Sequence, residues 1–323
     1  MCIRDRFTAE WYKNTSEDLL YAVPVPEQAG VSNTTVTMNA ASMNNSGFEF
    51  SATYRNRDHD FKYEVSANLS TLRNRVTSLG FGTDSYISGS YITKVGQEIG
   101  QFYGWVYEGI ARTQEDLDNH ATQEGAQIGD CLYKDVNNDG KVDSEDQVVL
   151  GSGMPKINFG LNARFEYKRF DLSIATFGAL NYHVSDDIYN SLNSCYGWGN
   201  KEVGMLEANR FSEDGSTYLS NVPRTYVTNS ASLGWNDLFS SRKIQNAAYW
   251  KIANVELGYN FPDKWFGKYV SDVRFYVSAQ NLHTFTGYHG YNVDYAGGTF
   301  TPGYNFCSYP TARTFMCGVH FTF

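Results

Sequence analysis

The residues best placed to do chemistry in this 323-residue chain lie in one short segment, residues 135–146. Side chains that carry oxygen recur there at every second position, and Gly140 stands at the sixth place, where a tight turn needs a glycine. Calcium takes about six to eight hard oxygen ligands, which alternating Asp and Asn residues can supply on one side of a turn. Lys141 would contribute only its backbone carbonyl, so its charge can point away from the ion. The spacing predicts an EF-hand-like calcium site formed by Asp135, Asn137, Asp139, Lys141, Asp143 and Asp146.

Asp146 stands where an EF-hand places a bidentate Glu, so the loop is closer to the calcium repeats of dockerins than to calmodulin. The ion would be structural and would fix a long loop. An Asx-rich surface turn without an ion, held by hydrogen bonds from side chains to the backbone, is the alternative.

Catalysis is not implied anywhere in the sequence. The six His are scattered without ligand spacing, and the HExxH, GxSxG, GxGxxG and P-loop patterns are absent. A net charge of −9 argues against a nucleic-acid-binding protein, which needs clustered Lys and Arg. We therefore expect no catalytic residues, no enzyme activity and no nucleic-acid partner.

Aromatic residues with polar neighbours are frequent in the segments expected to be loops. Flat rings beside hydrogen-bonding groups suit sugar rings, a peptide or a partner protein. Packing of the loops on one another is the alternative for each residue. The candidate substrate-binding residues are Tyr196, Trp198, Trp235, Tyr288 and Tyr291.

Strands with strict alternation of apolar and polar residues are the elements that would position these loops. Such alternation predicts antiparallel β structure, and mid-strand Glu, Lys, Arg and Asn on the polar face suit a hydrated lumen. No stretch has the roughly 18 consecutive apolar residues of a membrane-spanning helix. The alternating segments are residues 47–54, 61–70, 157–167, 170–177, 253–261, 273–281 and 314–323.

The connections between these segments alternate between short and long. Turns at about 57–60, 168–170 and 262–272 are short, whereas those at about 74–155, 182–247 and 284–311 are long. This is typical of an outer-membrane β-barrel, with short periplasmic turns and long extracellular loops. Aromatic residues crowd the short-turn ends and predict a periplasmic aromatic girdle: Tyr54, Phe61, Tyr63, Phe165, Tyr167, Phe170, Phe261, Trp265, Phe266, Phe321 and Phe323.

Several motifs resemble the barrel of SusC/RagA-type TonB-dependent receptors. They include residues 44–49, 95–104, 133–141, 277–282 and 310–315, and they occur in order over essentially the whole chain after Arg6. The resemblance implies an all-β fold, the C-terminal portion of a plugged barrel of about 22 strands. By the alternation we expect about eight of those strands here.

The resemblance also implies a function and partners. It implies an importer of oligosaccharides or peptides in the outer membrane of a Gram-negative bacterium, with a SusD-like surface lipoprotein as its lid. Energy would come from TonB–ExbB–ExbD through a plug that has no counterpart in this sequence, so we expect this chain alone to transport nothing. Residues 1–6 look like a truncated leader. The alternative is a secreted carbohydrate-active or carbohydrate-binding β-protein with a dockerin-like calcium loop.

Two further expectations concern geometry and cysteines. The strands should form one curved antiparallel sheet that does not close, with unprotected edges that favour aggregation. The five cysteines permit a disulfide such as Cys195–Cys307, although unpaired small apolar residues are the simpler interpretation. The apolar faces that should all point outward are marked by Phe48, Phe61, Leu161, Leu257 and Val319.

Overall fold

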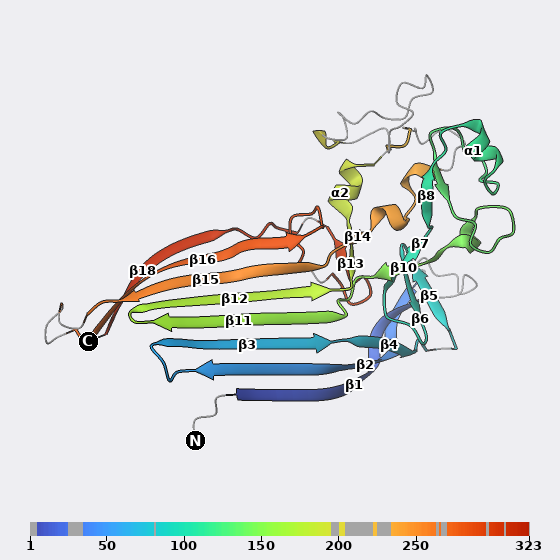
Figure 1. Cartoon of the computed structure of the whole chain (residues 1–323). Helices are drawn as coiled ribbons and strands as arrows, with labels where there is room; N and C mark the ends of the chain where they lie inside the picture. The colour runs from blue at the N-terminus through green and yellow to red at the C-terminus, as the bar shows by residue number, and fades with distance from the viewer. Residues whose placement is uncertain are drawn as a thin grey trace.

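The computed structural model describes a large curved sheet with a layer of loops at one of its ends (Figure 1). No helix in its described part is long and apolar enough to cross a membrane. The residues described are 5–24, 35–80, 82–194, 200–203, 222–224, 234–262, 265, 270–294, 297–306 and 308–322.

The large sheet is a meander of eight antiparallel strands in chain order. A short strand, β4 (Arg73–Ser78), pairs with β2 beside this path. The order confirms the predicted antiparallel fold and the expected number of strands. The eight strands are β1 (Asp5–Pro24), β2 (Thr35–Asn56), β3 (Phe61–Thr71), β11 (Ile157–Tyr167), β12 (Phe170–Leu180), β15 (Tyr249–Asn260), β16 (Asp272–Thr286) and β18 (Thr314–Thr322).

Register turns the alternation in sequence into two chemically different faces. Directly paired residues of neighbouring strands point to the same side of a sheet. Val65 pairs with Ala163 and Leu257 pairs with Val277, so apolar residues meet apolar residues from strand to strand. A one-residue slip would exchange the faces, which is why the register is strongly specified.

The apolar face of the sheet is exposed. Leu161 and Leu257 keep 42% and 45% of their surface accessible, and Phe48, Phe61 and Val319 are exposed as well. A two-sheet sandwich would bury these residues in its core. The large sheet is therefore a single layer, as predicted for a barrel wall.

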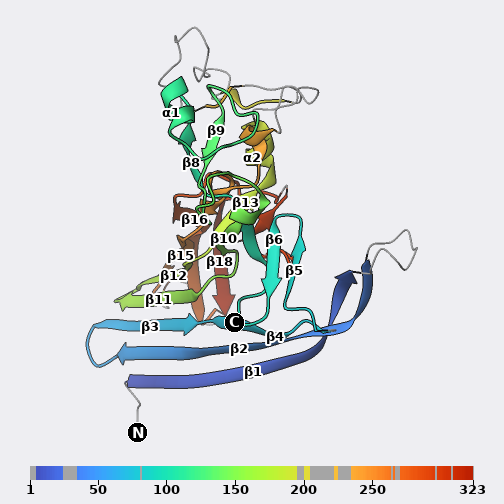
Figure 2. The same cartoon turned by 90° about the vertical axis from the view of Figure 1, so that its right-hand side faces the viewer.

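The sheet curves along its width, as the side view in Figure 2 shows. Within the described residues, the outer edges of β1 and β18 have no strand partner, so the sheet is open. This agrees with the expectation of a sheet that does not close.

The short turns gather at one end of the sheet and carry a band of touching aromatic rings. Phe61 lies 6.0 Å from Phe165 between ring centroids, and Phe170 lies 4.9 Å from Tyr259. Such rings suit a membrane–water interface. Phe266 and Phe323 lie outside the described residues. Further contacts within the band join Tyr54 to Tyr63, Phe61 to Tyr63 and Tyr167, and Phe261 to Tyr259 and Trp265.

The opposite end carries the loop layer, a term used here for residues 79–156, 181–248 and 287–313. Its elements form a four-stranded sheet (β10-β7-β6-β5), a three-stranded sheet (β14-β13-β17) and the pair β8–β9. The parts of the expected long loops that the structure describes therefore contain regular secondary structure. The elements are β5 (Ser85–Ser88), β6 (Tyr91–Lys94), β7 (Gln101–Gly104), β8 (Tyr107–Ile110), α1 (Gln114–Asp118), β9 (Cys131–Tyr133), β10 (Val148–Ser152), β13 (His183–Asp186), α2 (Asp187–Leu192), β14 (Gln245–Asn246) and β17 (Tyr304–Asn305), with 3-10 turns at Ser144–Asp146, Trp235–Asp237 and Ser241–Lys243.

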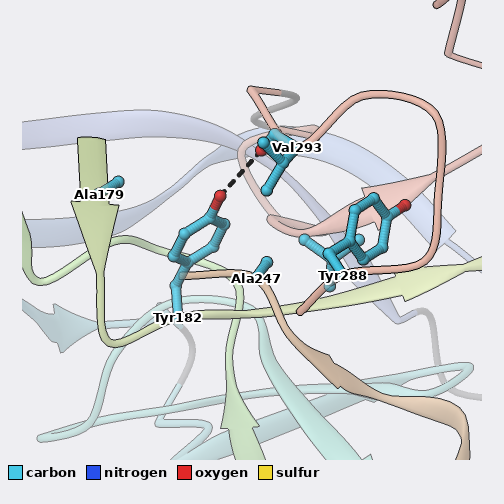
Figure 3. Close-up of a cluster of buried hydrophobic side chains, with 6 residues drawn as sticks. Ala179, Tyr182, Ala247, Tyr288 and Val293 are labelled. Carbon is cyan, nitrogen blue, oxygen red and sulfur yellow. Dashed lines mark hydrogen bonds between the residues drawn. The ribbon is translucent and has the colours of Figure 1, made fainter. Parts of the chain in front are cut away.

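The buried cores of the molecule lie in or beside this loop layer. One of them joins the end of β12 to the second and third long connections, with the Tyr182 hydroxyl donating to the carbonyl of Val293 at 2.8 Å (Figure 3). A second packs the first long connection on β2 and β4, and a third surrounds Tyr133 and Trp235. Segments distant in the sequence are thereby fixed to one another.

The first hairpin is longer than the alternation predicted. β1 and β2 contain 20 and 22 residues, whereas about ten residues suffice for a tilted membrane strand. Asp5 and Arg6 already pair with Tyr54 and Thr53, so the expected leader overlaps the first strand. Residues 1–4 lie outside the described part of the chain.

Candidate functional site

The polar face of the sheet carries charged side chains, several of which form ion pairs with one another. Arg274 binds Asp171 through two nitrogen–oxygen contacts of 3.0 and 2.5 Å and also reaches Glu256 at 2.7 Å. A Cβ at position 258 would lie 2.4 Å from the guanidinium, so Gly258 provides the space for this network. This face of the sheet therefore carries fixed charges of both signs.

The same face is linked to the loop layer by an ion pair. Lys251 of β15 is buried, and its ammonium lies 2.6 Å from a carboxylate oxygen of Asp294. The side chain also lies over the ring of Phe177, 5.7 Å from its centroid. A buried cation needs such a partner because desolvation is costly. The pair fixes the third long connection over the end of the sheet.

The predicted calcium loop is an ordered turn held by its own acidic side chains. The two carboxylate oxygens of Asp135 accept from the backbone N–H groups of Asn138 and Gly140, at 2.6 and 2.9 Å. The side-chain oxygens of Asn137 and Asp139 each accept from the N–H two residues on. Gly140 has a φ of +87°, a conformation that a glycine adopts without strain. The loop is thus an Asx-rich turn held by hydrogen bonds from its side chains to its own backbone.

The direction of the Lys141 side chain differs from the expectation. Its ammonium does not point away but lies 2.7 Å from an oxygen of Asp143 and 3.6 Å from one of Asp139. The hydrogen bond from Lys141 and the backbone N–H of Glu145 lower the pKa of Asp143. The lysine supplies the positive charge that neighbouring carboxylates attract.

Asp146 fits a structural role better than a ligand role. Its carboxylate is fully buried, and it accepts from the N–H groups of Val136 and Asn137 with one oxygen and of Asp143 with the other. In the described ranges, no three His, Cys, Asp or Glu side chains are grouped so that they could hold a metal. Asp135, Asn137, Asp139 and Asp143 would have to exchange hydrogen bonds to receive an ion. Calcium binding stays a prediction.

The three aromatic candidates within the described residues do not form one surface. Trp235 is buried and donates from Nε1 to the carbonyl of Glu124 at 2.9 Å. Tyr288 is buried too, and its hydroxyl donates to Asp186 and accepts from Asn305. Both therefore belong to the cores of the loop layer, because a buried ring with a polar tip needs an internal partner. Tyr291 is 70% exposed, and Tyr196 and Trp198 lie outside the described residues.

The sequence did not predict a groove of about 760 Å³ in the loop layer, which polar side chains line together with aromatic rings. It is lined by the turn before β6, by one side of α2 and by Tyr304 of β17. Asp187, Asn190, Ser191 and Ser194 follow the i, i+3, i+4, i+7 spacing of one helical face, and this was the signal available in the sequence. The groove needs three distant segments, which the sequence alone could not bring together.

A buried ion pair was also missed. Asp130 is 2% exposed and binds Arg224 at 2.6 and 2.9 Å, and it accepts from Asn236 at 2.8 Å. These contacts join the first and second long connections beside the core around Trp235. Cys131 next to it is buried and forms no disulfide within the described residues, and Cys317 is an exposed thiol without a disulfide there. Cys2, Cys195 and Cys307 lie outside the described residues.

Comparison with known proteins finds relatives that are all named TonB-dependent receptors. The chain is 30% identical over 97% of its length to TonB-dependent receptor P3 of Formosa agariphila, and 25% identical over 97% to TonB-dependent receptor SusC of Bacteroides thetaiotaomicron. It spans 32% and 29% of these two relatives, about a third of their length. No protein-family model matches it.

A solved structure shares the fold. The structure of the RagAB peptide transporter superposes with a TM-score of 0.79 at 22% identity, over 99% of this chain and 33% of the transporter chain. At that identity the likeness concerns the fold alone. Over 97% of its length the chain is thus homologous to about a third of a TonB-dependent receptor, and its open antiparallel sheet with one apolar and one polar face agrees with that similarity.

Proposed function

We propose that this chain forms part of the wall, and of the loop layer above it, of an outer-membrane importer in a Gram-negative bacterium. One observation carries the proposal: a single-layer sheet exposes large apolar side chains on one face and charged side chains on the other. An exposed apolar face of this extent needs an apolar environment, which lipid supplies. The charged face then lines a hydrated lumen.

The whole receptor would take up an oligosaccharide or a peptide. Relatives named TonB-dependent receptor and SusC, and the fold of a peptide transporter, support uptake of a polar polymer. A SusD-like lipoprotein would cover the loop layer, and TonB–ExbB–ExbD would act through a plug. The relatives' names describe receptors and transporters, which supports the expectation that the chain is not an enzyme.

The alternative, a secreted carbohydrate-binding β-protein, fits the sheet less well. A water-soluble sheet covers its apolar face with a second layer. Leu161, Leu257 and Phe275 keep between 40% and 45% of their surface exposed instead.

Calcium binding by residues 135–146 is part of the proposal. Gly140, the Asx residues and the closed turn support it, and the ion would be structural. It would have to displace the Lys141 ammonium from Asp139 and Asp143.

Uptake by living cells tests the proposed function. Cells that carry the complete gene should import labelled oligosaccharide or peptide only when their TonB system is intact, and cells that express this chain alone should import neither. Uptake by the chain alone, or hydrolysis of a glycan by the purified chain, would contradict the importer.

A further inference from the structure

The groove between α2 and the turn before β6 contains a buried polar group without a partner. Tyr91 is 8% exposed and lines the groove, yet its hydroxyl makes no hydrogen bond in the described structure. Buried polar groups are nearly always paired, so each exception calls for an explanation such as a missing ligand or water. Burial raises the pKa of the Tyr91 phenol far above its ordinary value, and the neighbouring Tyr304 adds to the rise. The hydroxyl therefore stays protonated and can donate.

The side chains around this hydroxyl are polar and fixed. Asn190 donates to Ser185 at 3.2 Å and to the carbonyl of Lys243 at 3.1 Å, and Ser194 donates to Asp237 at 2.6 Å. Burial raises the pKa of Tyr304, and the neighbouring Asp187 carboxylate adds to the rise. The groove is preorganised because its polar groups already hold one another in place.

The kinds of group present favour a sugar over a peptide. An extended peptide is bound through backbone groups at an open strand edge. This groove presents instead the face of a helix, a turn and a half-exposed Tyr304 ring. Hydroxyl, amide and carboxylate groups beside aromatic rings match a ring that is polar at its rim and apolar on its faces.

The charge of the groove excludes one class of sugar. Among the described residues that line the groove, Asp187 and Asp237 contribute two carboxylates and Lys243 contributes one cation, which lies 3.8 Å from Asp237. The lining is therefore negative overall, and a uronic acid or a sulfated sugar would meet like charge. A neutral sugar would meet hydrogen-bond acceptors.

We infer that this groove binds part of a neutral oligosaccharide, with the Tyr91 hydroxyl and the Asp187 carboxylate as contacts to sugar hydroxyls. A volume of about 760 Å³ lies within the usual range of small-molecule sites, roughly 300–1,000 Å³. The inference rests on the proposed importer function and narrows its substrate class.

The test uses the complete receptor that contains this chain. Binding is measured by calorimetry with neutral oligosaccharides of glucose, fructose, xylose or mannose, with oligogalacturonates as the anionic arm and a tryptic digest of casein as the peptide arm. Tyr91→Phe removes one hydrogen bond and should weaken the best neutral ligand roughly 3- to 10-fold. Asp187→Asn should weaken it about tenfold or more, because it removes a charged acceptor. Tyr309→Phe, which removes an exposed hydroxyl outside the groove, is the matched control and should bind unchanged.

The outcomes separate the groove from the importer. If Tyr91→Phe and Asp187→Asn each left TonB-dependent uptake of a neutral oligosaccharide unchanged, sugar binding by the groove would be overturned. That result would still agree with the importer. Binding of peptides or oligogalacturonates alone would overturn it as well. A Tyr91→Phe receptor that melts earlier but binds as before would show that another segment of the receptor holds the hydroxyl, which also overturns the proposal. If neither the neutral oligosaccharides nor the oligogalacturonates nor the peptides were taken up in a TonB-dependent manner, the importer itself would be refuted.

Discussion

An arginine–carboxylate ion pair occurs both on the sheet and in the loop layer, but the two pairs differ in their exposure to solvent. On the sheet, Arg55 and Glu64 form an ion pair at 2.8 Å with side chains 48% and 30% exposed. In the loop layer, Arg224 and Asp130 pair at 2.6 Å with side chains 20% and 2% exposed. Water screens the first pair, whereas the second replaces its water with protein partners. The Arg55–Glu64 pair is therefore expected to add little to stability, whereas the Asp130–Arg224 pair joins two connections of the loop layer.

Breaking the buried pair should produce the largest effect. Asp130→Ala leaves the Arg224 guanidinium without its carboxylate partner and removes one of two acceptors of the Asn236 amide, so we expect a loss of about 3–5 kcal/mol in local stability of the loop layer. Hydrogen exchange of residues 127–134 measures it in the complete receptor. Glu64→Ala, the matched change on the sheet, should cost less than about 1 kcal/mol. Equal losses of stability for Asp130→Ala and Glu64→Ala would contradict the proposed difference between the two ion pairs.

A charge placed on either face of one strand tests the lipid contact. Leu161 and Asn162 are neighbours, both exposed, and they point to opposite faces of β11. Leu161→Lys should destabilise the receptor in lipid by about 2–4 kcal/mol, whereas Asn162→Lys should change little. Denaturant titration in phospholipid vesicles measures both. A soluble sheet would tolerate both lysines alike, and that result would remove the membrane assignment.

Two tyrosines sharpen the contrast between buried and exposed aromatics in the loop layer. Tyr288→Phe leaves Asp186 and Asn305 without the hydroxyl that lies between them, so we expect a loss of roughly 1–3 kcal/mol. Tyr291→Phe removes an exposed hydroxyl and should be neutral. Proteolysis of the loop layer in native receptor reports the two stabilities. If Tyr291→Phe were the more damaging, the assignment of Tyr288 to the core would be wrong.

Competition between two cations tests the loop at residues 135–146. Calcium should protect this loop from hydrogen exchange, and Asp139→Ala should abolish that protection. Lys141→Met removes a competing charge near Asp139 and Asp143, so it should lower the dissociation constant for calcium. Calorimetry on the complete receptor measures the affinity. Absence of any calcium-dependent heat in both proteins would leave Lys141 as the cation of this loop.

Lowering the pH should destabilise the loop at residues 135–146, and we expect this effect to be smaller than those of the substitutions above. The pKa of Asp143 is lowered in the folded state by the hydrogen bond from Lys141 and by the N–H of Glu145. A lowered pKa stabilises the fold above the ordinary value of 3.8 and loses that contribution as the pH falls through the folded value. Hydrogen exchange of residues 135–146, corrected for its intrinsic pH dependence, should therefore rise below about pH 4 in the parent. Asp143→Asn should remove this step, and an unchanged step would assign it to another carboxylate.

The sequence by itself determined the sheet. Alternation fixes which residues share a face, because side chains of a strand point to opposite sides in turn, and the short turns fix which strands pair. Phe61, Leu161 and Leu257 could therefore be placed on the exposed face without a structure. The calcium-like turn was readable for the same reason, since Asp135, Gly140 and Asp143 act on neighbouring backbone.

Only the tertiary structure decided the loop layer. Trp235 and Tyr288 have the local composition of ligand-binding aromatics, but their partners, Glu124 and Asp186, lie 111 and 102 residues away along the chain. The Asp130–Arg224 pair spans 94 residues, and the groove beside Tyr91 needs three separate connections. No local rule of spacing reports such contacts, because chain entropy leaves distant segments free until packing joins them.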